Sequence, residues 1–303
     1  MKISTFVFCV LWFAVLAPAF WRPAQSSDGA STVSASPTLK RRYQDGEAIS
    51  YLMKATNQSP RGTIQYSIQA SGAVKKNANG ALVEEFAWSG LTVNGESIEL
   101  TPASRSFRQQ LALSPDYTIT IPPLDKVQPM LIGPITDLLT FYADLSLVMR
   151  QSGLKRVGDH VYFKYGGPNS WADGTYVVLG EDSIDFDMTL RTVDTHERTA
   201  TVVVRHVPPA QPQVRLTAAW MSAPVADTQN NWVEVSKSGA EYAAKVGKEI
   251  FEVEMVVSLR DGKLVSAVMH NPVEVLERNC SDAALAICGE PTRYRILRTV
   301  SIN

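Results

Sequence analysis

The sequence predicts a mainly β protein of the α+β kind: a large curved antiparallel sheet, as a half-barrel or a sandwich, with one long apolar helix packed on it. Three observations predict this fold class. Apolar and polar residues alternate through several segments, Asn-Gly and Asp-Gly pairs separate some of those segments, and one segment shows helical periodicity. Strands and helices do not alternate along the chain, which argues against a parallel nucleotide-binding α/β fold.

The first predicted strands lie in the first hundred residues. Apolar residues occupy every second position in 49–54 and again in 64–69, the pattern of strands with one buried face. Asn79-Gly80 and Asn94-Gly95 follow, and Asn-Gly readily adopts the positive φ angles of a tight hairpin turn. This part of the chain therefore predicts an antiparallel meander.

The second half of the sequence shows the same alternation more strongly. Asp261-Gly262 is the strongest short hairpin signal in the chain, and Asp194–Arg198 is the expected turn of another hairpin. The predicted strands of this half are 182–190, 199–207, 251–259, 264–275 and 294–302. No fixed internal period is present, so the sequence does not support a propeller or a solenoid.

One helix is predicted over residues 134–152, beginning at Gly133-Pro134 and ending at Gly153. Its apolar positions recur at helical spacing, and they are Ile135, Leu138, Leu139, Tyr142, Leu145 and Met149. Thr136, Asp137, Thr140 and Asp144 form only a narrow polar side. A helix this apolar needs an apolar counter-surface, which we expect on the concave face of the sheet, around Phe186 and Met188 or around Phe251, Val253 and Met255.

The N-terminus predicts export. Met1-Lys2 is a short basic start, and residues 5–20 form an uncharged apolar run followed by small residues, as in a secretory signal peptide. We expect a signal peptide over 1–26, a flexible leader over 27–40, and a β-rich domain over 41–303 in the periplasm or outside the cell. The domain forms one unit or two halves, 41–130 and 154–303, around the helix.

Cysteine usage agrees with export. With Cys9 inside the apolar run, Cys280 and Cys288 remain as an even pair that encloses a short loop, which predicts a disulfide in an exported chain. A metal site would need more Cys or His nearby, and a nucleophilic cysteine would need a histidine and a carboxylate from elsewhere in the chain.

No catalytic or metal signature is present. The 29 Lys and Arg residues balance 30 Asp and Glu residues, so we expect no nucleic-acid partner. The four histidines are isolated, and Gly-x-Ser-x-Gly is absent, so we expect no metal, no cofactor and no serine-nucleophile elbow. Asp185 and Asp187, with His206 at the end of the partner strand, are the one candidate cluster for a cation-dependent hydrolase. The competing interpretation places both carboxylates on the solvated face of a sheet.

A resemblance follows from Tyr43-Gln-Asp-Gly-Glu47, the alternating Ile49–Lys54, the helix and the later Asp-Gly hairpins. Together they resemble uncharacterised secreted β-rich proteins of acidobacteria-like bacteria over most of 41–303, a resemblance that implies no activity. The layout is also loosely similar to the lipoprotein-localization carriers, in which a half-barrel wraps over a helix. That similarity implies an apolar concave surface able to shelter an acyl chain.

The sequence therefore leads to one main functional expectation. We expect an exported, non-enzymatic binding protein that shelters a lipid or another apolar molecule between the sheet and the helix, in a groove lined by the six apolar helix residues. The alternative is a structural or partner-binding envelope protein without a ligand. The sequence does not indicate an oligomeric state.

Overall fold

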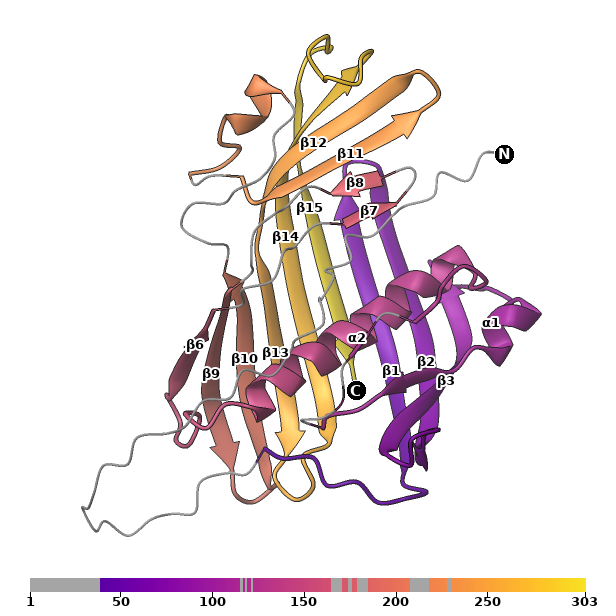
Figure 1. The fold of residues 1–303 in the computed structure, drawn as a ribbon, viewed down its shortest axis with the longest axis vertical. Helices are drawn as coiled ribbons and strands as arrows, with labels where there is room; N and C mark the ends of the chain where they lie inside the picture. The colour runs from indigo at the N-terminus through magenta and orange to yellow at the C-terminus, as the bar shows by residue number, and fades with distance from the viewer. Residues whose placement is uncertain are drawn as a thin grey trace.

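One antiparallel sheet and one long helix make up most of the molecule (Figure 1). The computed structural model describes residues 39–114, 117, 119–120, 122–164, 171–173, 176–178, 185–207, 218–227 and 230–303. The strands are β1 (Ala48–Ser59), β2 (Gly62–Lys76), β3 (Leu82–Val93), β4 (Glu96–Ser97), β5 (Gln109–Leu111), β6 (His160–Phe163), β7 (Trp171–Asp173), β8 (Tyr176–Val178), β9 (Asp185–Asp194), β10 (Thr199–Val207), β11 (Trp232–Ser238), β12 (Glu241–Glu249), β13 (Phe251–Ser258), β14 (Leu264–Cys280) and β15 (Thr292–Ile302). The helices are α1 (Pro102–Ser106), α2 (Pro129–Met149) and the 3-10 helix η1 (Ala219–Ser222).

The described strands confirm the predicted fold class, a large open antiparallel sheet with one long apolar helix. The order begins β4-β3-β2-β1-β15-β14, so the first and last long strands, β1 and β15, are neighbours. The N-terminal and C-terminal halves of the chain therefore share one sheet. The predicted meander is present as β1, β2 and β3, and the second-half hairpins are present as β9 with β10 and β13 with β14.

The sheet divides at β14. Residues 264–270 of this strand pair with β13, from which the sheet continues through β10 and β9 to β6. Residues 273–280 pair instead with β12, from which it continues through β11 to β8 and β7. The chain passes from β12 to β13 at Ile250, whose amide donates to Pro272 O at 3.0 Å. Asn271 supports this division, because its Nδ2 donates to Ile250 O at 3.0 Å and to Glu249 Oε1 at 2.9 Å.

Helix α2 crosses the strands obliquely on one face of the sheet (Figure 1). The prediction of a helix was correct, but its predicted start at Pro134 was wrong. The helix begins at Pro129, which is the proline whose missing N–H is harmless at a first turn. Pro134 lies inside the helix, where it removes the hydrogen bond that its amide would otherwise donate to Met130 O.

Two main apolar clusters fill the fold, beside a third that contains only Val273 and Val275 as buried residues. The larger one lies between α2 and the sheet and contains residues of β1, β2, β3, β9, β10, β13, β14 and β15. Helix α2 is the one described helix long and apolar enough to cross a membrane, and 89% of its most apolar window is buried, as in a core helix. The smaller cluster includes Met221, Val233, Val246, Leu276 and Leu285, beside the β11–β12 hairpin.

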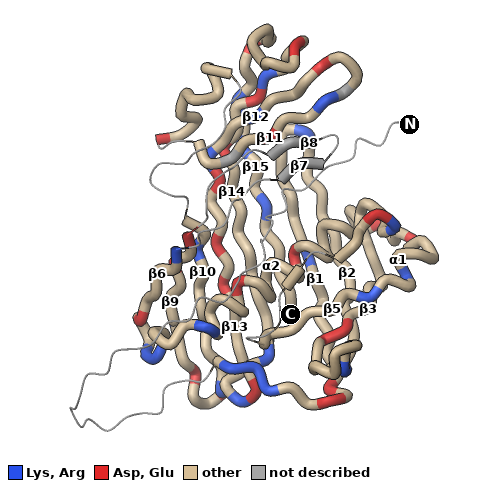
Figure 2. Tube along the Cα trace, viewed as in Figure 1, with Lys and Arg blue, Asp and Glu red and all other residues tan. Residues whose placement is uncertain are grey.

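Charged side chains are distributed without separation of sign. Figure 2 shows Lys and Arg interspersed with Asp and Glu over the molecule, apart from the short basic run at 40–42. Helix α2 contains two aspartates and no basic residue. This distribution agrees with the balanced composition, and the described residues form no broad basic surface.

Candidate functional site

The six helix residues predicted to line an apolar groove belong to the larger core cluster or pack against it. Five are at most 2% exposed, Ile135, Leu138, Leu139, Tyr142 and Leu145, and Met149 packs against them as a partly buried residue. Both predicted counter-surfaces belong to the same cluster, through Phe186, Met188, Phe251, Val253 and Met255. The helix and the sheet therefore share one apolar core.

The narrow polar side of α2 also points inward. Asp137 is 3% exposed and Asp144 is fully buried. Because they are seven residues apart, they lie on the same face of the helix, about 10 Å from each other along its axis. A buried carboxylate is costly without a partner, so each of them requires a donor from the sheet.

Asp137 is held by two strands. One guanidinium nitrogen of Arg298 on β15, Nη2, donates to both carboxylate oxygens of Asp137, at 2.5 and 2.6 Å. The Tyr66 hydroxyl on β2 donates to Asp137 Oδ2 at 2.5 Å. Burial raises the pKa of Tyr66 well above its usual value, and the neighbouring Asp137 charge raises it further, so the hydroxyl remains a donor.

Asp144 is held by the other half of the sheet. His206 Nε2 on β10 lies 3.0 and 3.1 Å from the two carboxylate oxygens of Asp144, so Nε2–H is the donor to an ionised carboxylate. The imidazole lies between two aromatic rings, with its centroid 4.8 Å from that of Phe186 and 4.3 Å from that of Phe251. Its other nitrogen, Nδ1, is buried and has no hydrogen-bond partner among the residues that the structure describes.

A row of polar residues crosses the sheet beneath the helix. Asn57 on β1 is opposite Arg298, and Arg298 is opposite Asn271 on β14, so all three side chains project from the same face. Glu249 continues the row, since it accepts from Asn271, and His206 completes it. We refer to Asn57, Arg298, Asn271, Glu249 and His206 as the polar row. Asn57 Oδ1 is buried and, like His206 Nδ1, has no partner in the described part of the chain.

Glu249 is the carboxylic acid of the polar row, and its pKa is shifted. Burial raises the pKa of its carboxyl, while the hydrogen bond from Asn271 and the positive charges of His206 and Arg298 oppose that rise. The polar row thus combines Arg298, a histidine and a carboxyl group inside an otherwise apolar layer.

Tyr142 has a polar role beside its apolar one. Its hydroxyl donates to Glu84 on β3 and lies 3.3 Å from the hydroxyl of Tyr51. Arg41 Nε donates to the other oxygen of Glu84 at 2.9 Å. Burial raises the pKa of Glu84, although the Arg41 charge lowers it. Together with the pairs at Asp137 and Asp144, this contact fastens α2 to the sheet at three points.

The structure does not bring the predicted Asp185, Asp187 and His206 cluster together. On β10, His206 faces the core, whereas Asp185 and Asp187 project from the opposite face of β9, since Phe186 between them contacts His206. Asp185 accepts from the Tyr162 hydroxyl at 2.6 Å, and Asp187 lies 3.1 Å from His160 Nε2. The expectation of a solvated carboxylate is wrong for Asp185, which is 8% exposed.

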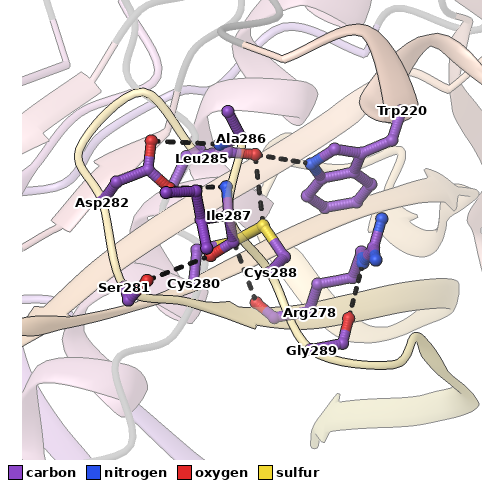
Figure 3. The surroundings of a disulfide bond; sticks show 10 residues. All are labelled: Trp220, Arg278, Cys280, Ser281, Asp282, Leu285, Ala286, Ile287, Cys288 and Gly289. Carbon is purple, nitrogen blue, oxygen red and sulfur yellow. Dashed lines mark hydrogen bonds between the residues drawn. A yellow bond between two sulfur atoms is a disulfide. The ribbon is translucent and has the colours of Figure 1, made fainter.

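The predicted disulfide is present, between Cys280 and Cys288 at a Cα separation of 4.0 Å (Figure 3). Asp282 shapes the enclosed loop by accepting from the amides of Ala286 and Ile287 at 3.2 and 2.7 Å. Trp220 Nε1 donates to Leu285 O at 2.9 Å and ties η1 to the loop. The loop contributes Cys280 and Leu285 to the smaller cluster, whereas His206 of the polar row packs against Phe186 and Phe251 of the larger one.

Of the polar row, sequence reasoning named only His206, and it missed the other four residues and both aspartates as site residues. A signal for the row exists, because several members occupy inward positions in alternating strands: Asn57 follows Tyr51, Met53 and Ala55, His206 follows Val202 and Val204, and Arg298 precedes Val300 and Ile302. A polar residue at an inward position needs a buried partner. No comparable signal identifies Glu249, which lies where β12 ends.

Among the described residues, no group of three or more His, Cys, Asp or Glu side chains is arranged to hold a metal ion. No protein-family model matches this chain, and no curated protein is significantly similar to it. The geometry between α2 and the sheet is therefore the basis for a proposed function.

Proposed function

We propose that this chain is an exported, non-enzymatic binding protein that holds a lipid or another apolar molecule between α2 and the sheet. The observation that carries the proposal is a predominantly apolar helix lying across one face of an open sheet, fastened by side-chain pairs at Asp137, Tyr142 and Asp144. Export is supported by the signal-like residues 1–26, which lie outside the described residues, and by the disulfide.

The gain and the cost of such an exchange are similar in size. Displacing α2 would expose the leucines of the helix and the apolar face of the sheet, which an acyl chain would then cover. Burial is worth about 0.8 kcal/mol per methylene, so the ten methylenes of a twelve-carbon fatty acid contribute about 8 kcal/mol. Separating two of the three polar pairs costs a comparable amount, at about 3–5 kcal/mol for each pair left broken.

The test uses ligand binding and a space-filling substitution. Native mass spectrometry of protein purified without detergent should show a lipid-sized adduct, and a fluorescent fatty acid should bind at micromolar concentration. Leu139→Trp or Leu145→Trp should abolish both signals, because each enlarges a side chain in the layer. Val265→Trp is the matched control, since Val265 is 44% exposed on β14 and should leave binding unchanged.

The alternative is a structural or partner-binding envelope protein without a ligand. One observation favours it, namely the near-complete burial of five of the six predicted groove residues in a single packed core. An adduct-free spectrum together with no fatty-acid binding by the unsubstituted protein would eliminate the carrier and leave this alternative. Circular dichroism of each variant separates lost binding from lost folding.

A further inference from the structure

The segment before the first strand, residues 39–47, is fastened to the folded domain. Figure 1 shows it in indigo at the lower end of the sheet, where it passes the turn between β13 and β14 before it enters β1. Leu39 is 7% exposed and belongs to the larger cluster. The amide of Arg42 donates to Asp261 O, in the β13–β14 turn, at 2.7 Å. We refer to residues 39–47 as the N-terminal strap.

Arg41 is the charged anchor of the N-terminal strap. Its side chain is 0% exposed, and it donates through Nε to Glu84 Oε1 at 2.9 Å and through Nη2 to Glu47 Oε2 at 2.8 Å. Glu84 is 1% exposed, whereas Glu47 is 19% exposed and also lies 3.7 Å from Lys263 Nζ. A buried guanidinium keeps its proton, so the docked strap depends on the negative charges of these two carboxylates.

Glu84 connects the strap to α2 and β1. Its second oxygen accepts from the Tyr142 hydroxyl, which lies 3.3 Å from the Tyr51 hydroxyl. Tyr51 in turn donates to Leu264 O at 2.9 Å. Burial raises the pKa of both tyrosines, and of Tyr43 on the strap, so all three hydroxyls stay neutral. The carboxyl of Glu84 is therefore the group of this cluster that can take up a proton while every tyrosine keeps its own.

A proton on Glu84 affects its two contacts differently. A protonated carboxyl carries one O–H donor, and a tyrosine hydroxyl both donates and accepts. Glu84 can then donate to Tyr142, which donates to Tyr51, so the contact with α2 is kept. Arg41 instead loses the negative charge of Glu84, and Glu47 remains as its ionic partner. We infer that Glu84 is a proton-sensitive latch, which on protonation releases the N-terminal strap while α2 stays attached.

The direction of this effect follows from the surroundings of the carboxyl. Burial raises the pKa of Glu84, whereas the charge and the hydrogen bond of Arg41 lower it, as does the hydrogen bond from Tyr142; the charge of Glu47 raises it. Tyr142 still covers the carboxyl when the strap leaves, so opening removes the cation while much of the burial remains. The pKa of Glu84 is therefore higher with the strap open than with it closed. Because such coupling is reciprocal, acid favours the open strap and neutral pH the docked one. This inference does not rest on the proposed ligand.

Trypsin cleavage at the basic run 40–42 tests the latch at a constant pH of 7.5. Cleavage there requires an open strap, because this backbone is packed against the β13–β14 turn. Glu84→Gln removes the charge and keeps both a donor and an acceptor, as in a protonated carboxyl. Mass spectrometry of the new N-termini should show cleavage about tenfold faster than in the unsubstituted protein. Glu85→Gln is the matched control, because Glu85 is the next residue of β3 and pairs with the exposed Lys75, so its rate should be unchanged.

Hydrogen exchange tests the pH dependence in the unsubstituted protein and does not depend on the folding of Glu84→Gln. Between about pH 7.5 and 4.5, after correction for intrinsic exchange rates, protection of residues 39–47 should fall about tenfold while α2 remains protected. In Glu84→Gln, strap protection should be low throughout and independent of pH. Equal trypsin cleavage of Glu84→Gln and the unsubstituted protein overturns the inference. Strap protection that is unchanged or higher in acid, or that is lost together with the protection of α2, also overturns it.

Discussion

The pair between Asp137 and Arg298 predicts a strong non-additive effect on stability. Both side chains are less than 10% exposed, so solvent screens their interaction little. Removing one partner should lower the free energy of unfolding by about 3–5 kcal/mol, because the other charge stays buried after losing this ion pair. Asp137→Leu and Arg298→Met are therefore each expected to be severely destabilising. For a chain of this size the melting temperature should fall by roughly 10 °C in either variant.

The double variant should recover much of that loss. The two introduced apolar side chains would pack as neighbours, and the remaining penalty includes the loss of the Tyr66 hydrogen bond to Asp137, about 1–3 kcal/mol. Urea unfolding followed by circular dichroism measures all four corners of the cycle. The control Arg205→Met removes an exposed pair and should cost less than about 1 kcal/mol. Additive losses in the double variant, or single losses below about 1 kcal/mol, would refute the reasoning.

Three further predictions concern other parts of the chain. Burial raises the pKa of the Glu249 carboxyl above 4.5. The folded protein therefore keeps the carboxyl proton at a pH where the unfolded chain has lost it. As a result, the free energy of unfolding falls as pH rises through the folded pKa. Glu249→Gln should remove this fall and gain stability relative to the unsubstituted protein between about pH 4 and 8 in thermal melts; parallel curves would contradict the assignment. Asp185→Asn combined with Asp187→Asn should lower the free energy of unfolding by less than about 2 kcal/mol. Ca²⁺ or Mg²⁺ should not change the melting temperature. A cation-dependent rise in the unsubstituted protein that the double variant loses would restore the enzyme hypothesis. Non-reducing peptide mapping should find Cys280 linked to Cys288, and replacing both with Ser should cost about 2–3 kcal/mol.

Local patterns predicted several of the strands and turns, but not β6, β11 or β12. Alternation in 49–54 predicted the inward residues of β1, because a strand places every second side chain on one face. Asn94-Gly95 predicted the turn that follows β3, where both residues have positive φ angles of 50° and 85°. Each of these signals is contained within a few consecutive residues, so no tertiary information is needed to interpret it.

The candidate site could not be predicted in the same way, because its partners are distant in sequence. Asp137 and Arg298 are separated by 161 residues, and nothing near Asp137 distinguishes an inward carboxylate from an outward one. On an apolar helix, two aspartates seven residues apart lie on one face, but the sequence does not show which residues cover that face. The strand order that brings β15 beside β1 is what determines their environment.

Gly262 shows how one local signal also has a long-range consequence. Its φ of +70° is the left-handed conformation that the Asp261-Gly262 turn requires. A Cβ atom at this position would lie only 2.4 Å from backbone atoms of Lys40, whose segment is fixed to the turn by the hydrogen bond from Arg42 N to Asp261 O at 2.7 Å. Substitution here should therefore disturb both the turn and the segment that carries Arg41.

A comparison of two glycine substitutions separates these effects. Gly239→Ala, in the β11–β12 turn, meets a φ of +66° but no atom within 4 Å, so it should cost only the left-handed strain of about 1–2 kcal/mol. Gly262→Ala should cost at least about 2 kcal/mol more, because it also displaces the Lys40 segment and weakens the buried pair of Arg41 with Glu84. Urea midpoints of the two variants measure the difference. Equal losses would mean that this segment does not hold Arg41 in place and that the pair forms independently of the turn.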